Sequence, residues 1–359
     1  MRLCAPSSKS LNIFISAYIA LIAILLFTTP LTQSEANILY LQNYNLSSAI
    51  AKFFYSLSYK HWFIRVPFFI LSIINIKLIK EIAYIYIKDE KYANLAILIY
   101  LITPGVFVSS ILINYATVAI FLTLIFIYGY HKSNKLLQIF SLVLLLFTGI
   151  ANFVFYIAIA LYSYKKRDWT IFYISLILLI IAIATQTYPI NGVPKGHLSQ
   201  VLGIYAVTLS PFYFFAVVYA IYRIALDKKE SLLWYIVTTF FVVSILLSFR
   251  QKIRVTDFTP FVVIASILVV SVYKNSISIR LKIFQKNYKR VCFIIVSVLL
   301  LETSLVAFSY PLYMLFGDKF KLIDTSIYKI SQKTNIKCKK EIKKRDINLY
   351  RYYGIKKCN

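Results

Sequence analysis

The residues of this chain that could do chemistry are charged side chains in the short segments between its long apolar runs. Glu35 follows the first apolar run, and a carboxylate there can act as general base on an incoming hydroxyl or amine. Arg250, Lys252 and Arg254 place three cations close together, which suits a phosphate or pyrophosphate group. Two other interpretations stay open: Glu35 as a solvated loop acid, and the three cations as partners of anionic lipid headgroups.

Two further polar residues are candidates for supporting roles. His197, in the segment Lys195-Gly196-His197, is a candidate base or metal ligand, or otherwise a solvated loop histidine. Arg65 begins the second apolar run, where it either extends to lipid headgroups or pairs with Glu35. The sequence holds no P-loop, GxSxG, HExxH or glycine-rich nucleotide motif. This absence argues against an ATP-driven pump and against the common soluble hydrolases.

The elements that must position these residues are membrane-spanning helices. The chain has 359 residues, of which 60% are hydrophobic and only 15% charged, whereas an ordinary soluble domain is roughly half apolar and a quarter charged. Its net charge of +27 is mostly confined to the gaps between apolar runs, where cytoplasmic loops of membrane proteins collect Lys and Arg. We therefore expect membrane lipids, and not nucleic acid, as partners.

The apolar runs predict an all-α, polytopic bundle with about eleven transmembrane helices. The expected spans are 11–29, 63–86, 93–112, a fourth ending at 130, two short helices within 136–164 that break at 148–152, 169–184, 201–224, 232–249, 258–273 and 291–314. Glu302 is isolated in the last span, and we expect it to be either protonated or hydrogen-bonded within the bundle.

The distribution of Lys and Arg predicts which loops face the cytoplasm. It places the N-terminus inside, and it places the first loop, the loop 186–200 and the segment 250–254 together at the outer face. An amphipathic stretch near 48–60 is expected to lie along the membrane surface. The prediction is thus a transmembrane domain over 1–315, followed by a basic tail, 316–359, at the outer face.

The four cysteines give no metal-binding pattern. Cys4, Cys292, Cys338 and Cys358 form no CxxC motif, which argues against a thiolate metal site. Cys338 and Cys358 both lie in the tail. They either form a disulfide outside the membrane or remain unpaired thiols.

Several short motifs occur in the order found in one family of membrane enzymes. They are Ser34-Glu35-Ala36 after the first span, the amphipathic stretch near 48–60, Arg65-Val66-Pro67 in the second span, the turn at Thr148-Gly149, and the segment from Arg254 to Pro260. In this order the chain resembles the GT-C membrane glycosyltransferases, in the branch of the protein O-mannosyltransferases and the lipid A aminoarabinose transferases. The resemblance covers the first 165 residues best and the later loops more loosely.

The resemblance implies a GT-C-like bundle in the bacterial inner (cytoplasmic) membrane. It also implies a transferase that moves a hexosyl or pentosyl group from a polyprenyl-phosphate carrier to a cell-envelope glycan, lipid or protein. Glu35 would then be the catalytic base, and Arg250, Lys252 and Arg254 would bind the carrier phosphate. The expected supporting residues are Arg65, Asn114, Lys195 and His197.

The chain departs from the family in several places. Ser34 stands where the family has the first of two adjacent acids, and Asn114 and Tyr115 stand where an Asp is common. The lysine of the turn at Thr148-Gly149 and a His- or Glu-led Pro motif before the interfacial helix are missing, and the usual outer C-terminal domain is reduced to a basic tail. These departures leave metal binding, by a divalent ion if any, an open question. The alternatives are a polysaccharide polymerase or ligase that uses similar lipid-linked donors, a transporter or flippase, and a non-catalytic scaffold for other envelope enzymes.

Overall fold

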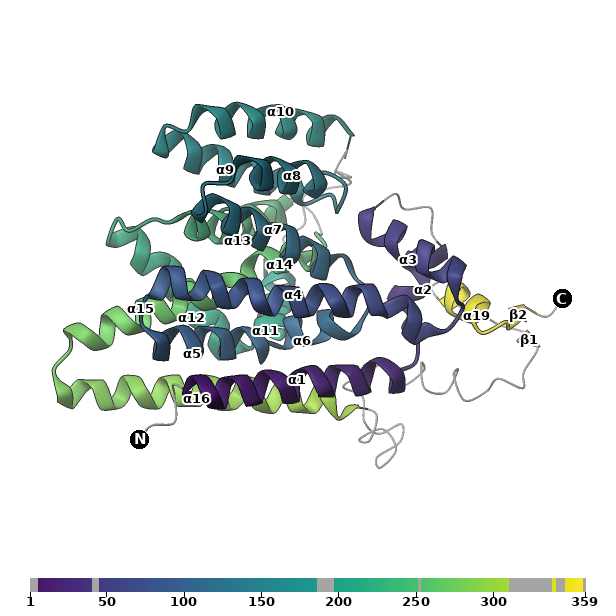
Figure 1. The fold of residues 1–359 in the computed structure, drawn as a ribbon, viewed down its shortest axis with the longest axis horizontal. Helices are drawn as coiled ribbons and strands as arrows, with labels where there is room; N and C mark the ends of the chain where they lie inside the picture. Colours follow the sequence, from purple (N-terminus) through teal and green to yellow (C-terminus); the bar gives the residue numbers. More distant parts are fainter. Residues whose placement is uncertain are drawn as a thin grey trace.

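The computed structural model describes residues 6–40, 45–185, 197–250, 253–309, 338–339 and 346–357. The described residues form a bundle of helices, many of which run side by side along the long axis of the molecule (Figure 1). The first half of the chain contains α1 (Ser8–Thr28), α2 (Gln33–Tyr40), α3 (Leu46–Leu57), α4 (His61–Ile87), α5 (Glu90–Leu101), α6 (Pro104–Ile111), α7 (Tyr115–His131), α8 (Lys135–Leu145), α9 (Asn152–Lys166) and α10 (Trp169–Thr185).

The second half continues the bundle and ends in a small cap. It contains α11 (Leu198–Leu209), α12 (Pro211–Leu226), α13 (Leu232–Arg250), η1 (Val255–Asp257), α14 (Thr259–Val262), η2 (Val263–Ala265), α15 (Ser266–Ile279), α16 (Lys282–Ala307) and α19 (Ile347–Tyr352). Two short parallel strands, β1 (Cys338–Lys339) and β2 (Lys356–Lys357), flank α19 in the sequence. The helical class predicted from the apolar runs is therefore observed.

The length and composition of the helices indicate several membrane crossings. Among the described residues, five stretches are long and apolar enough to cross a membrane: α1, α4, α13, residues 259–279 and α16. The number rises to seven if each of two bent helix pairs counts as one span. α7, α8 and α10 are apolar but shorter. The predicted total of about eleven crossings stays a prediction.

Large apolar side chains on the outer helices face away from the protein interior. Ile13 of α1, Ile180 of α10 and Leu301 of α16 are more than half exposed. Extended apolar surfaces of this kind mark contact with a membrane or another protein. The interior is formed by such helices as α7, α9, α13 and α14, where the rings of Phe240 and Phe261 stack with their centroids 3.8 Å apart.

Two predicted spans are broken, which the sequence analysis did not anticipate. The span expected at 93–112 is divided into α5 and α6, which meet at an angle of 61°, and the span expected at 201–224 is divided into α11 and α12, at 105°. A proline occupies the first position of the second helix in each pair, Pro104 in α6 and Pro211 in α12. Proline has no N–H to donate, and it excludes the preceding residue from helical backbone angles.

The loops at one end of the bundle form a compact group, which we call the loop end. It comprises α2, α3, η1, the turns 112–114 and 146–151, and α19, which packs against α2 (Figure 1). α3 is the amphipathic helix expected near 48–60, and the Asn45 and Ser48 side chains cap its start. The two short helices expected within 136–164 are α8 and α9. The helices themselves are thus observed, and the position of α3 along the membrane surface stays a prediction.

Candidate functional site

Glu35 and Arg65 form a fully buried ion pair at the loop end. Both side chains are 0% exposed, and the Arg65 Nη2 atom lies 2.7 Å from the Glu35 Oε2 atom. Arg65 Nε also donates to Glu35 Oε1 at 2.8 Å, so the guanidinium binds the carboxylate through two parallel hydrogen bonds. The structure thus selects the second of the two alternatives for Arg65, pairing with Glu35 instead of extending to headgroups.

The remaining hydrogen bonds of the pair connect four segments of the chain. Glu35 Oε2 accepts from the backbone N–H and the hydroxyl of Thr32, both at 2.8 Å, and Glu35 Oε1 accepts from the backbone N–H of Ile113 at 2.9 Å. Arg65 Nη1 donates to the Thr29 carbonyl at 2.7 Å, and Nη2 donates to the Pro30 carbonyl at 2.9 Å. The pair therefore holds together the end of α1, the start of α2, the start of α4 and the turn before α7.

This environment keeps Glu35 ionised. Burial alone would raise the pKa of its carboxyl, but the charge of Arg65 and the hydrogen bonds from Arg65, Ile113 and Thr32 outweigh burial and lower that pKa. The carboxylate accepts five hydrogen bonds, whereas its two oxygens offer only about four lone pairs. The role of Glu35 as catalytic base stays a prediction, and the observed geometry gives it a positioning role.

A second carboxylate, Asp257, lies at the same end and is less enclosed. It belongs to η1, and its backbone carbonyl accepts a hydrogen bond from the Tyr115 hydroxyl. Burial raises the pKa of the Asp257 carboxyl from 3.8 to about 6, although the charge of Arg254 and a hydrogen bond with Thr256 act in the opposite direction. Near neutral pH this carboxylate is ionised and still basic enough to accept a proton.

One short segment connects the two acids. Ile113 contacts Glu35 through its backbone N–H, and Tyr115, two residues later, contacts Asp257 through its hydroxyl. The Tyr115 ring also lies against the turn between α8 and α9, where a Cβ added to Gly149 would be 3.4 Å from the ring. The structure therefore brings Glu35, the turn at 148–149 and the segment 254–257 to one end of the bundle.

Other predicted site residues have structural contacts or lie outside the described residues. Asn114 caps α7: its Oδ1 accepts from the Thr117 N–H at 3.0 Å, and its Nδ2 donates to the carbonyls of Ser109 in α6 and Leu112 in the turn that follows. His197 is half-buried before α11, and its backbone N–H donates to the Ser248 carbonyl at 3.0 Å. Arg250 ends α13 and is exposed, as is Arg254. Lys195 and Lys252 lie outside the described residues.

Sequence reasoning missed Asp257 as a functional candidate, although a signal was present. The residue stands in Arg254-Val255-Thr256-Asp257, directly before an apolar span that begins with a proline. An acidic and a basic side chain close together at the start of a membrane span are unusual enough to suggest a functional site.

Metal-binding groups and cysteines add little to the site. Within the described part of the chain, no group of three or more His, Cys, Asp or Glu side chains is placed to hold a metal ion. Cys292 is buried in α16. Cys358 lies outside the described residues, so the predicted choice between a Cys338–Cys358 disulfide and two thiols stays open.

Comparison with known proteins assigns the chain to no family. No protein-family model, curated protein or solved structure matches it. Its function is therefore inferred from the residues of the loop end and from their chemistry.

Proposed function

We propose that this protein is a membrane transferase that moves a sugar from a polyprenyl-phosphate carrier to a cell-envelope acceptor at the loop end. The observation that carries the proposal is the place of Asp257: its carboxylate is partly buried in η1, close to the cation of Arg254. Burial raises the pKa of this carboxyl to about 6. A weak base next to a cation at the end of a membrane bundle suits nucleophilic attack on a phosphate-linked sugar.

The proposed reaction uses Asp257 as the base. The Asp257 carboxylate takes the proton of an acceptor hydroxyl or amine as the acceptor's oxygen or nitrogen bonds to the anomeric carbon of the sugar. The bond between that carbon and the phosphate oxygen breaks, and its electron pair leaves with the polyprenyl phosphate. Arg254, with Arg250 and Lys252 from the same segment, stabilises the negative charge that develops on the leaving phosphate.

Glu35 has a different task in this proposal. Its ion pair with Arg65 fixes the first loop against the turn that carries Tyr115, and Tyr115 contacts the backbone of Asp257. A buried, fully bonded ion pair is a rigid support for a neighbouring reactive group. Glu35 is thus a positioning residue in this proposal. The catalytic base is Asp257 of η1 and not the acid of the first loop.

The distribution of cations supports an orientation with the loop end outside the cytoplasm. The turns at the opposite end of the bundle carry many lysines and arginines, as cytoplasmic loops do (Figure 1). They include Lys88, Lys91, Lys132, Lys135, Lys165, Lys166, Arg167, Lys228, Lys229, Arg280 and Lys282. In this proposal the shorter helices complete about eleven crossings of a bacterial inner membrane, in a GT-C-like arrangement.

A second candidate function is a polysaccharide polymerase or ligase that uses the same type of donor. Such enzymes depend on arginines of the outer loops more than on an early acid, and the closed ion pair of Glu35 favours this alternative. Asp257→Asn and Arg254→Ala separate the two candidates. A transferase with a carboxylate base loses most activity in the first variant, and an arginine-dependent polymerase loses most in the second.

The decisive experiment measures sugar transfer in membranes that contain the full chain. A panel of radiolabelled polyprenyl-phosphate hexoses and pentoses is supplied, and label in lipid, glycan and protein fractions is counted. We expect Asp257→Asn to lower transfer about 100-fold or more, the usual contribution of a general base. The matched control is Asp227→Asn, which alters an acid at the opposite end of the bundle, paired with Arg223. Unchanged transfer in Asp257→Asn would exclude the proposed base.

A further inference from the structure

Both broken spans are interrupted in the same way. α5 ends before Thr103-Pro104, and α11 ends before Ser210-Pro211, so each break consists of a hydroxyl residue followed by a proline. A helix broken inside a membrane leaves backbone carbonyls without partners at the end of its first half. Such groups persist at membrane depth only where they are buried in protein or line a polar site.

The two breaks lie against each other. A Cβ placed on Gly105, at the start of α6, would be 3.0 Å from the Thr208 carbonyl oxygen near the end of α11. This separation is tighter than most contacts of a real Cβ, so glycine fits here best and a larger residue would shift one of the two backbones slightly. The start of α6 and the end of α11 therefore meet at one junction, and broken helices coordinate cations at such junctions in membrane transporters.

α16 supplies a carboxylate to this junction. The Thr303 hydroxyl donates to the Ile102 carbonyl at the end of α5, at 2.5 Å, and the neighbouring residue is Glu302. Glu302 lies about 17 Å along the helix from Val291, where the apolar part of α16 begins, which is close to the middle of a membrane span. Its Oε2 atom is shielded from solvent and has no hydrogen-bond partner among the described residues.

The hydroxyl of Ser210, at the break between α11 and α12, is a second polar group without a partner at this junction. The Ser210 side chain is 0% exposed, and its hydroxyl has no hydrogen-bond partner among the residues that the structure describes. The Ser210 hydroxyl lies near the Glu302 carboxylate, and the Ser210 Oγ and Glu302 Oε2 atoms both lack a hydrogen-bond partner among the described residues. Ser210 also has a φ of +78°, a strained value for a residue with a side chain. Strain of this kind is concentrated at functional sites.

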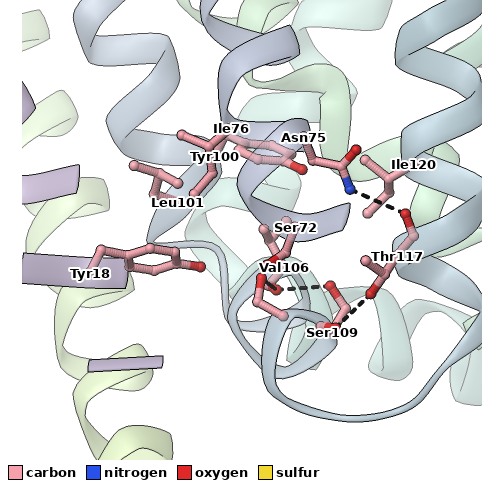
Figure 2. Close-up of a pocket in the computed structure, with 11 residues that line it drawn as sticks. Tyr18, Ser72, Asn75, Ile76, Tyr100, Leu101, Val106, Ser109, Thr117 and Ile120 are labelled. Atoms are coloured by element: carbon pink, nitrogen blue, oxygen red, sulfur yellow. Dashed lines mark hydrogen bonds between the residues drawn. The ribbon is translucent and has the colours of Figure 1, made fainter. Parts of the chain in front are cut away.

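A small polar cavity adjoins the junction. Tyr18, Asn75, Ser109 and Ser110 are among the residues that line it, together with residues on both sides of the α5–α6 break (Figure 2). Its volume is about 10 Å³, room for about one water molecule. The Tyr18 hydroxyl and the Asn75 Oδ1 atom are buried there without partners in the described part of the chain. The cavity can therefore hold a water beside the broken helix.

We propose that the junction of the two broken helices binds a small monovalent cation, Na⁺. Glu302 is its anionic ligand, and the Ser210 hydroxyl and the Thr208 carbonyl near the end of α11 are its neutral ligands. Oxygen ligands from one carboxylate, a hydroxyl and unwound backbone match the sites that hold Na⁺ in membrane proteins with broken helices. This site is independent of the proposed transferase chemistry, because it lies at mid-bundle and shares no residue with the loop end.

The test uses the full chain purified into lipid nanodiscs. Binding of radioactive sodium is measured against unlabelled NaCl, and the unfolding temperature is followed by tryptophan fluorescence in mixtures of NaCl and choline chloride at constant ionic strength. We expect saturable binding to one site per chain. We also expect the unfolding temperature to rise by about 3–5 °C when Na⁺ is roughly a hundredfold above its Kd.

Three variants distinguish the site from a general salt effect. Glu302→Gln should abolish sodium binding and the temperature shift. Ser210→Gly should weaken binding about tenfold or more, and because glycine suits a φ of +78° the backbone stays in place. Glu81→Gln, which alters an exposed carboxylate elsewhere in a candidate span, should change neither. The proposal is overturned if the unmodified protein binds no sodium, or if Glu302→Gln and Ser210→Gly bind it as tightly as the unmodified protein.

Discussion

Replacement of Glu35 by glutamine should destabilise the folded protein strongly. Both members of the Glu35–Arg65 pair are 0% exposed, and removal of one partner from a buried ion pair costs about 3–5 kcal/mol. The amide group of glutamine makes the loss worse in either orientation. Each oxygen of Glu35 faces only donors, those of Arg65 and Ile113 on one side and those of Arg65 and Thr32 on the other, so an NH₂ group always meets an N–H.

The assay is denaturant unfolding of the full chain in detergent, with circular dichroism reporting helix content. The matched control is Asp168→Asn, which removes one partner from the surface pair of Lys135 and Asp168, whose side chains are 49% and 28% exposed. Exposed pairs contribute only about 0–1 kcal/mol. The double variant Glu35→Leu/Arg65→Met should cost less than either single change, because it leaves no unpaired buried charge.

One result would refute a positioning role for Glu35. If Glu35→Gln loses less than about 1 kcal/mol of stability and yet abolishes sugar transfer, the carboxylate acts on the acceptor and the original prediction of a catalytic base is right. If stability falls and transfer falls only with it, the ion pair is a support. Measurement of both quantities on the same preparation separates these outcomes.

Three further predictions follow from the same contacts. Sugar transfer should increase with pH and reach half its maximum near pH 6, because only ionised Asp257 accepts a proton; a rate independent of pH between about 5 and 7 would contradict this. Because the pKa of Glu35 is lowered in the folded state, its contribution to stability is complete above the ordinary value of 4.5 and is lost as the pH falls through the folded pKa. Thermal unfolding measured in acid should show this loss of stability in the unmodified protein. The Glu35→Gln variant should not show it. Gly105→Ala should push α6 away from the Thr208 carbonyl and weaken sodium binding, and unchanged binding would show that this approach is not required.

Much of the helical organisation is predictable from the sequence because it depends on local pattern. Long apolar runs allow only helices in a membrane, where every backbone group must find a partner within its own segment. The break at 148–152 and the amphipathic helix near 48–60 were located for the same reason, since Gly and alternating polarity act over a few residues. Even the pairing of Arg65 with Glu35 could be stated as one of two alternatives.

The broken spans could have been predicted but were not. Hydropathy is continuous through Thr103-Pro104 and through Ser210-Pro211, so a search by apolar length passes over both. The prolines were the local signal, because each begins a new helix at a position where its missing N–H costs nothing. A run of about twenty apolar residues predicts one continuous helix, and a single proline within it does not change that prediction by length alone.

The sequence could not predict that the Glu35 carboxylate has all of its hydrogen-bonding capacity occupied. Two of its five hydrogen bonds come from the neighbouring Thr32, but the others come from Arg65 and from Ile113, which is 78 positions away. Whether an acid after a first span is a free base or a bonded anchor depends on that distant turn. The elevated pKa of Asp257 depends in the same way on burial by segments that its own motif does not contain.

Glu35 and Glu302 differ in how far the protein compensates each carboxylate for its lost solvation. This difference separates structural carboxylates from those that bind a ligand. A carboxylate removed from water must regain the lost solvation from a cation or from hydrogen bonds. Glu35 regains this solvation from the charge of Arg65 and from five hydrogen bonds, so no lone pair of its carboxylate is left to bind a ligand. Glu302 has no cationic side chain bonded to it in the described residues, and it lies beside the strained, unpartnered Ser210. An ionised Glu302 therefore requires a cation that the described residues do not supply, and the sodium measurement asks directly whether Na⁺ binds.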